Sequence, residues 1–71
     1  MDKYRETIAA LLRAQLTPLE YLVLTAVYLD GLSEAVAASQ LTIDLGVPVS
    51  RSMVHRAKQD ALARVRLEVA A

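Results

Sequence analysis

The sequence predicts a small all-α domain of three to four helices, with a tight turn between the last two. Of its 71 residues, 55% are hydrophobic and only two are glycine and two proline, which suits a compact helical chain with few turns. Apolar residues recur three and four positions apart, which is the period of an α-helix. No segment alternates as a half-buried strand does, since Val47 and Val49 only flank Pro48.

Length and cysteine content constrain the fold further. The chain is expected to form a single domain, 1–71, and a domain of this size buries only about 60% of its unfolded surface. Because there is no cysteine, neither a disulfide nor a cysteine-based metal site can reinforce the domain. We therefore expect apolar packing to form the core, helped by a second copy of the chain.

The first two helices are predicted from spacing and from a capping signal. In the first, apolar residues recur at helical spacing at Tyr4, Ile8, Leu11 and Leu12. The second starts at "TPLE", which puts Thr17 at the N-cap, Pro18 at the first helical position and Glu20 at the third. It ends at Asp30-Gly31, where Gly31 can adopt the left-handed conformation. Its middle, "YLVLTAVYL", is apolar nearly all round, so we expect it to be the central buried helix.

The third and fourth helices are predicted on either side of a proline. The third begins at Ser33 and ends at Gly46, and Pro48 prevents it from continuing. Its apolar positions are Ala37, Ala38, Leu41 and Leu45. The fourth begins at Ser50, a good N-cap residue, and its tail "LEVAA" either frays or continues the helix. Its apolar stripe consists of Val54, Ala57, Ala61 and Val65, widened by Leu62.

Basic residues are concentrated in this last helix. Five of the eight Lys and Arg residues lie between 47 and 66, and none lies between 14 and 50. Asp60 is the only acid between Arg51 and Arg66, so five basic residues and one acid give this segment a formal charge of plus four. On a helical wheel with Val54 facing the core, the outer face carries Ser52, Arg56, Gln59 and Ala63, flanked by His55 and Arg66 on one side and by Met53 and Asp60 on the other.

This polar and positive face has two interpretations. It can be a solvated surface, since Arg near a helix C-terminus is favourable to the helix dipole. It can also read DNA, because major-groove readers present Arg, Gln and Ser from one helix to base edges while other cations bind phosphates. The four acids between residues 14 and 50 would then face away from the DNA. Zero net charge is compatible with this if charge is segregated, but it argues against strong non-specific binding.

The last helix resembles the recognition helix of sigma-factor region four. That family's pattern is Ser-Arg, two variable residues, an aliphatic residue, six more, Ala-Leu, and a closing basic-aliphatic-Arg. It falls here on Ser50-Arg51, Val54, Ala61-Leu62 and Arg64-Val65-Arg66 without a gap. Upstream, "LTPLEYLVLTAVYLDGLS" resembles the preceding helix in its Leu-x-Pro start, its Glu, its apolar run and its Tyr-x-x-Gly ending. Plasmid repressors of the KorA (TrfB) type look similar, and the resemblance covers residues 16–66.

The resemblance implies a sigma-factor region 4-like helix-turn-helix domain that binds double-stranded DNA. The implied role is a transcriptional regulator, and we expect a repressor of a bacterium, plasmid or phage. Two features depart from the pattern, because the segment from Ser33 to Gly46 is longer than the usual first helix and "GVPVS" is longer than the usual turn.

Five residues are expected to face DNA. The positions that match the family imply contacts by Arg51, Ser52, His55 and Arg56, and the helical wheel adds Gln59. Arg56 can bridge O6 and N7 of guanine, and Gln59 can pair with adenine. Arg51 lies near the helix start, so it is expected to contact a phosphate.

The remaining side chains of this helix are expected to pack. Lys58 falls toward the core side, where it would snorkel or pair with an acid. Met53 can touch a thymine methyl or fill the core, and core filling is favoured. The packing face of the fourth helix, Val54, Ala57, Ala61 and Leu62, is expected to meet the second helix at Leu22, Val23, Ala26 and Val27.

Other functions receive less support from the sequence. One histidine, no cysteine and scattered carboxylates offer no catalytic or zinc-binding set, so we expect no enzyme, metal or cofactor. The alternative is a protein-interaction module that binds RNA polymerase or another transcription factor. DNA reading requires Arg56, Gln59 and His55 to be exposed and unpaired, whereas a protein interface would show apolar side chains there.

The expected oligomeric state and cellular location follow from these interpretations. A homodimer is expected, since one short recognition helix gives limited specificity. The first helix and the tail with Val65, Leu67 and Val69 are candidates for a dimer seam, unless they cover the protein's own core. With no signal peptide and no apolar run of roughly 20 residues, we expect a soluble cytoplasmic protein that does not enter a membrane. The ending "EVAA" is also compatible with a DNA-binding part of a longer protein.

Overall fold

The computed structural model describes residues 2–70, and every regular element among them is helical. The elements are α1 (Asp2–Ala14), α2 (Pro18–Leu24), η1 (Thr25–Leu29), α3 (Glu34–Leu45) and α4 (Arg51–Ala70). η1 is a π-helical segment that continues α2 directly, so residues 2–70 form four helical rods. The predicted all-α class is confirmed, and the tail continues the last helix as far as Ala70. None of these helices is both long enough and apolar enough to cross a membrane.

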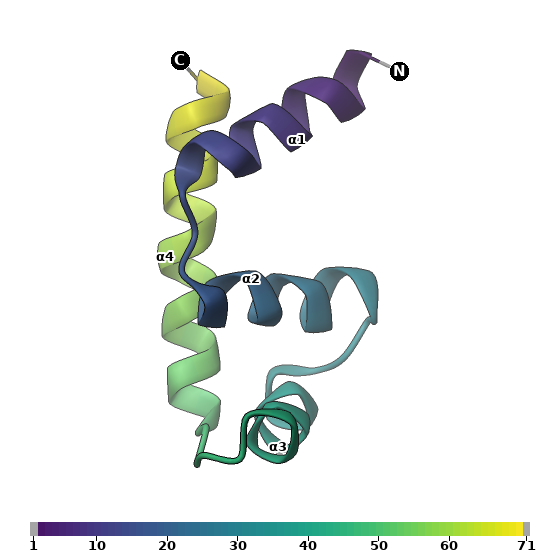
Figure 1. Cartoon of the computed structure of the whole chain (residues 1–71), viewed down its shortest axis with the longest axis vertical. Coiled ribbons are helices and arrows are strands. Elements are labelled where there is room, and N and C mark those ends of the chain that lie inside the picture. The colour runs from purple at the N-terminus through teal and green to yellow at the C-terminus, as the bar shows by residue number, and fades with distance from the viewer. Residues whose placement is uncertain (1, 71) are drawn as a thin grey trace.

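The longest helix, α4, is the element on which the others assemble (Figure 1). α1, α2 and α3 each pack against α4, with α1 toward its C-terminal end and α3 beside its N-terminal end. α1 and α2 extend from α4 toward the same side, one above the other in the view of Figure 1. The result is an elongated molecule of 36 × 20 × 17 Å.

The core is small and rich in alanine. Its main cluster joins residues of α2, η1, α3, α4 and the last connection, namely Val23, Ala26, Ala37, Ala38, Leu41, Val49, Val54 and Ala57. Val23 and Val54 are the largest fully buried side chains among the described residues. Alanine allows helices to approach closely but removes little apolar surface from water, so this core stabilises the fold less than one of leucine and phenylalanine would.

The predicted helix ends are confirmed. The Thr17 hydroxyl accepts a hydrogen bond from the Glu20 N–H at 3.2 Å, and the Glu20 carboxylate accepts one from the Thr17 N–H at 2.8 Å, which completes the capping box. The Ser33 hydroxyl caps α3 through a single hydrogen bond, accepted from the Val36 N–H at 3.2 Å. Gly31 and Gly46 follow the ends of η1 and α3 with φ of 71° and 70°, the left-handed region that favours glycine.

The end of the second helix is wider than an α-helix. The N–H of Asp30 donates to the carbonyl of Thr25 at 3.0 Å, five residues back along the chain. The N–H of Leu32 then donates to the carbonyl of Ala26 at 3.0 Å and closes the helix end around Gly31. The sequence pattern predicted the end of this helix but not its π-helical geometry.

The second helix is not the buried central helix that its composition predicts. α4 packs against α2 and α3 packs against η1, and the residues buried by this packing include Val23 and Ala26. The other side remains open, with Tyr21 59%, Tyr28 56% and Leu29 80% exposed. An apolar composition therefore did not imply burial on all sides.

α1 packs through small residues instead of through its large ones. Ala10 and Ala14 are buried, whereas Ile8 is 55% and Leu12 is 73% exposed. The side chain of Tyr4 lies outside the described residues. Arg13 and Glu68 form an ion pair with Nε and Oε2 3.1 Å apart, which joins α1 to the last turns of α4. Ile8 and Leu12 thus do not cover the protein's own core.

Two further leucines at apolar positions of the predicted helices lie at the surface. Leu22, expected against α4, is 37% exposed, and Leu45, at the end of α3, is 42% exposed. Val49 of the following turn is buried and joins the core cluster instead. The predicted packing face of α4 is otherwise confirmed, with Leu62 half-buried at its margin.

Candidate nucleic-acid interface

The connection between α3 and α4 is held at both ends. Gly46 stops α3 with its N–H bonded to the carbonyl of Thr42 at 3.0 Å. The Thr42 hydroxyl accepts the N–H of the buried Val49 at 2.9 Å. Ser50 then caps α4, since its hydroxyl accepts the N–H of Met53 at 3.1 Å. This fixed connection determines how α4 is rotated relative to α3.

The rotation of α4 exposes the face that the helical wheel predicts. Val54, Ala57 and Ala61 are buried, and α1, α2 and α3 all pack against this side of the helix. The side chains on the opposite side, such as Ser52 and Gln59, are therefore left in solvent. This confirms the predicted inner and outer faces of the helix.

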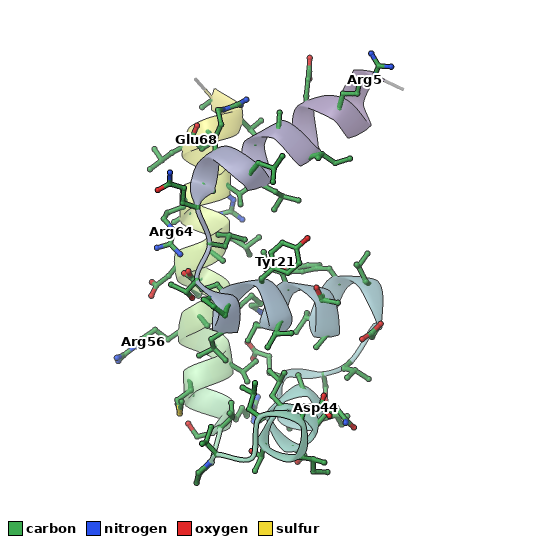
Figure 2. The ribbon with its side chains drawn as sticks, viewed as in Figure 1. Arg5, Tyr21, Asp44, Arg56, Arg64 and Glu68 are labelled. Carbon is green, nitrogen blue, oxygen red and sulfur yellow. The ribbon has the colours of Figure 1, made fainter. Side chains whose placement is uncertain are left out.

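All the predicted contact residues are exposed on α4: Arg51, Ser52, His55, Arg56 and Gln59. Arg56 projects away from the bundle (Figure 2). Within residues 2–70, neither Arg56 nor Gln59 forms a side-chain hydrogen bond or ion pair, so both meet the requirement for reading DNA. Met53 is 44% exposed, so the favoured interpretation of it as core filling is wrong.

His55 does not meet the requirement of being unpaired. Its Nδ1 lies 2.8 Å from Oε2 of Glu34 on α3, and Nζ of Lys58 lies 3.1 Å from the same oxygen. The His55 side chain is still 57% exposed, and engagement of Nδ1 leaves Nε2 to meet an outside partner. The pairing of Lys58 with an acid confirms its predicted role. Hydrogen bonds from His55 and then Lys58 hold the pKa of Glu34 below its ordinary value of 4.5.

The cluster of Glu34, His55 and Lys58 makes the contact between α3 and α4 sensitive to acid. A carboxyl whose pKa is lower in the folded chain stabilises the fold above its unfolded pKa of 4.5, and this contribution is lost as the pH falls through the lower folded value. We therefore expect Glu34→Gln to be less stable than the parent at pH 6, with the difference shrinking as the pH falls below 4.5. Urea unfolding followed by circular dichroism at pH 6 and at a series of lower pH values measures this, and a difference that does not shrink with falling pH would contradict it.

A second ion pair involves a carboxylate that the sequence analysis assigned only to a helix cap. Glu20 is 5% exposed, and beside its capping role its carboxylate pairs with the guanidinium of Arg64 on α4. One side chain thus orders the start of α2 and ties it to the middle of α4. No spacing rule relates residues so far apart, so the pair could not be predicted.

These pairs reduce the positive charge that α4 presents. Two of the four acids expected to face away from DNA, Glu20 and Glu34, instead neutralise Arg64 and Lys58. The basic residues of α4 without an ion pair in the described part of the chain are Arg51, Arg56 and Arg66. The charge available to a polyanion is therefore smaller than the sequence suggests.

Comparison with known proteins does not assign a function to the exposed face of α4. No protein-family model, no curated protein and no solved structure matches the chain. The likeness to sigma-factor region four and to KorA-type repressors accordingly depends on residues 16–66 themselves, and function has to be argued from the exposed face of α4.

Proposed function

We propose that this chain is a helix-turn-helix domain, similar to sigma-factor region four, that binds specific double-stranded DNA and regulates transcription, as a repressor of a bacterium, plasmid or phage. The observation that carries the proposal is the outer face of α4. Arg51, Ser52, Arg56 and Gln59 are all exposed there, close to the capped start of the helix, and have no partner among the described residues. A polar face with free Arg and Gln side chains is what readout of base edges requires.

The shape of the molecule supports entry into the major groove. An α-helix with its side chains is roughly 10–12 Å across, close to the groove width of about 12 Å. α4 lies at the edge of the bundle (Figure 1), and Ser52, Arg56 and Gln59 are exposed on it. In this arrangement α3 and the connection to α4 would approach the DNA backbone.

Each exposed side chain has a proposed role. Arg56 bridges O6 and N7 of a guanine, Gln59 pairs with N6 and N7 of an adenine, and Arg51 binds a phosphate. Ser52 donates to a phosphate or a base edge. His55, whose Nδ1 is held by Glu34, presents Nε2 to the same groove.

The charge of the face predicts the mode of binding. With few unpaired arginines, phosphate neutralisation is limited, so binding without a preferred sequence should be weak and fall with added salt. One short face also reads few base pairs, which favours a homodimer on two half-sites. Such a regulator would work in the cytoplasm.

A second candidate is a protein-interaction module that binds RNA polymerase or another transcription factor. It is favoured by the internal neutralisation of Lys58 and Arg64, which lowers the affinity of α4 for a polyanion. Exposed apolar side chains elsewhere on the chain, such as Tyr28 and Leu29, would supply the contact surface.

Selection from random duplex DNA separates the two candidates. The purified chain is incubated with the pool at two salt concentrations, and bound DNA is sequenced. Enrichment of one motif at both concentrations is the expected result, and a palindrome in that motif would give the half-site spacing. Weak binding without enrichment would overturn DNA reading and favour the interaction module.

A further inference from the structure

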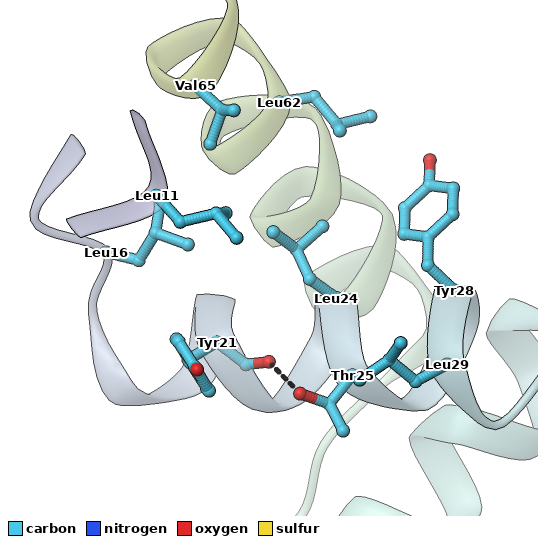
Figure 3. Close-up of a pocket in the computed structure, with 9 residues that line it drawn as sticks. All are labelled: Leu11, Leu16, Tyr21, Leu24, Thr25, Tyr28, Leu29, Leu62 and Val65. Atoms are coloured by element: carbon cyan, nitrogen blue, oxygen red, sulfur yellow. Dashed lines mark hydrogen bonds between the residues drawn. The ribbon is translucent and has the colours of Figure 1, made fainter. Parts of the chain in front are cut away.

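An apolar groove lies on the side of α4 away from Arg56 (Figure 2). It has a volume of about 370 Å³ and lies between α1, α2–η1 and the second half of α4. Leu11 closes one end, Tyr28 and Leu29 form one wall, and Leu62 and Val65 of α4 form another (Figure 3). None of its lining residues is charged, and the hydroxyl of Thr25 is already bonded to the carbonyl of Tyr21 at 2.9 Å.

The groove is too open to enclose a small ligand. Binding sites for small molecules bury about 70–90% of the ligand surface. Here the wall residues Tyr21, Tyr28 and Leu29 are themselves 56–80% exposed, so a small apolar molecule would remain largely in water. The apolar surface also extends beyond the groove onto α1, where Ile8 and Leu12 are exposed beside Leu11. An apolar surface this open and extended suits a partner that itself has a large contact area.

We propose that the partner is a second copy of this chain, joined across the groove by α1, α2–η1 and the end of α4. The proposal supplies the surface for the homodimer invoked in the proposed function. It uses none of the residues assigned to DNA, and it can be tested without DNA.

The exposed apolar area approaches that of a standard dimer interface. The exposed parts of Ile8, Leu12, Tyr21, Tyr28 and Leu29 together offer on the order of 500 Å², taking about 100 Å² from each. The half-buried walls of the groove bring the patch toward the roughly 800 Å² per partner of a standard interface. A patch of about 500 Å² lies in the upper part of the roughly 300–600 Å² range of the largest apolar patches on monomers, and patches of this size often mark an interaction site.

Three properties favour a second copy over a different protein. A two-fold contact requires a surface that is complementary to itself, and a patch without charged side chains meets that condition. The chain has zero net charge, so two copies do not repel each other at long range. The alanine-rich core gives one chain of 71 residues little stability of its own, so the fold benefits from a partner that is always present.

Sedimentation of the unliganded chain tests the proposal. We expect a mass of about 16 kDa, twice the 7.8 kDa of one chain, at micromolar concentration. Leu29→Glu, which places a charge in the groove wall, should shift the population to monomer and weaken association at least tenfold. Ile43→Glu is the matched control, because Ile43 on α3 is exposed to a similar degree, 75% against 80%, but lies outside the groove. Circular dichroism verifies that both variants remain helical.

Amide chemical shifts of the parent chain provide a test without substitution. On dilution, the amides of Tyr21, Leu24, Tyr28 and Leu29 should shift while those of Ile43 and Gln59 remain constant. A parent that stays monomeric, or a dimer that survives Leu29→Glu or dissociates equally with Ile43→Glu, would overturn the proposal. A monomer that binds specific DNA would overturn the dimer alone, whereas a dimer without DNA binding would overturn the proposed function alone.

Discussion

Arg56→Ala is expected to weaken binding to the selected DNA site by about 1–3 kcal/mol, or roughly five- to 150-fold in Kd. The guanidinium is exposed, projects from α4 and has no partner in residues 2–70, so its interactions are available to a base. Removing it leaves the guanine acceptors without their donors. Binding titrations with the selected duplex and with an unrelated duplex measure the loss. It should be larger for the selected one.

Two control variants distinguish base reading from charge. Arg56→Lys keeps the positive charge but loses the planar pair of donors, so it should also lose most of the preference for the selected site. Arg5→Ala removes an exposed arginine from α1, at the far end of the molecule, and should leave affinity unchanged (Figure 2). Thermal unfolding of Arg56→Ala should match the parent, because the side chain makes no internal contact with a charged or polar partner. Equal affinity of Arg56→Ala and the parent would refute the role of Arg56.

Glu20→Ala is expected to have the largest effect on stability, a loss of about 2–3 kcal/mol. It removes the capping box at the start of α2 and the ion pair with Arg64 at once. The Arg64 side chain is 41% exposed as a whole, but its Nε and Nη2 atoms are buried, so loss of the Glu20 carboxylate leaves buried donors unpaired and adds to the loss of the cap. A domain of this length has a total stability of roughly 4–10 kcal/mol, so the loss is a large fraction of it, and at the lower end of that range the variant would be partly unfolded at 37 °C.

Urea unfolding of matched variants separates the two contributions of Glu20. Glu20→Gln keeps an acceptor for the capping box and loses only the charge, so it should cost about 1 kcal/mol. Asp60→Asn removes an exposed acid of α4 and should change stability by less than about 0.5 kcal/mol. A loss in Glu20→Gln as large as in Glu20→Ala would mean that the ion pair, and not the cap, orders this region.

The two predictions concern different sides of α4, one that stabilises the fold and one that is assigned to DNA. The inner side of α4 stabilises the fold through the buried Val54 and Ala57 and through the ion pairs of Lys58 and Arg64. Its exposed side carries Arg56 and the other side chains assigned to DNA. Because these sets lie on opposite sides of one rigid helix, substitutions of one set should leave the other nearly unaffected.

Local sequence signals determined the helices and their ends. The capping box at Thr17, the glycines at 31 and 46 and the apolar stripe of α4 each act within a few residues, so their effect does not depend on the rest of the fold. The exposure of Arg56 and Gln59 was predictable for the same reason, since burial of Val54 determines which residues lie on the other side.

Only the tertiary structure decided which apolar and charged residues find partners. Composition predicted a buried second helix, yet Tyr28 and Leu29 remain exposed because packing is confined to one side of it. The wheel predicted a free cationic face, yet Glu20 and Glu34 reach α4 from other helices and neutralise part of it. Periodicity states which residues share a face, whereas burial and pairing depend on what the chain places opposite that face.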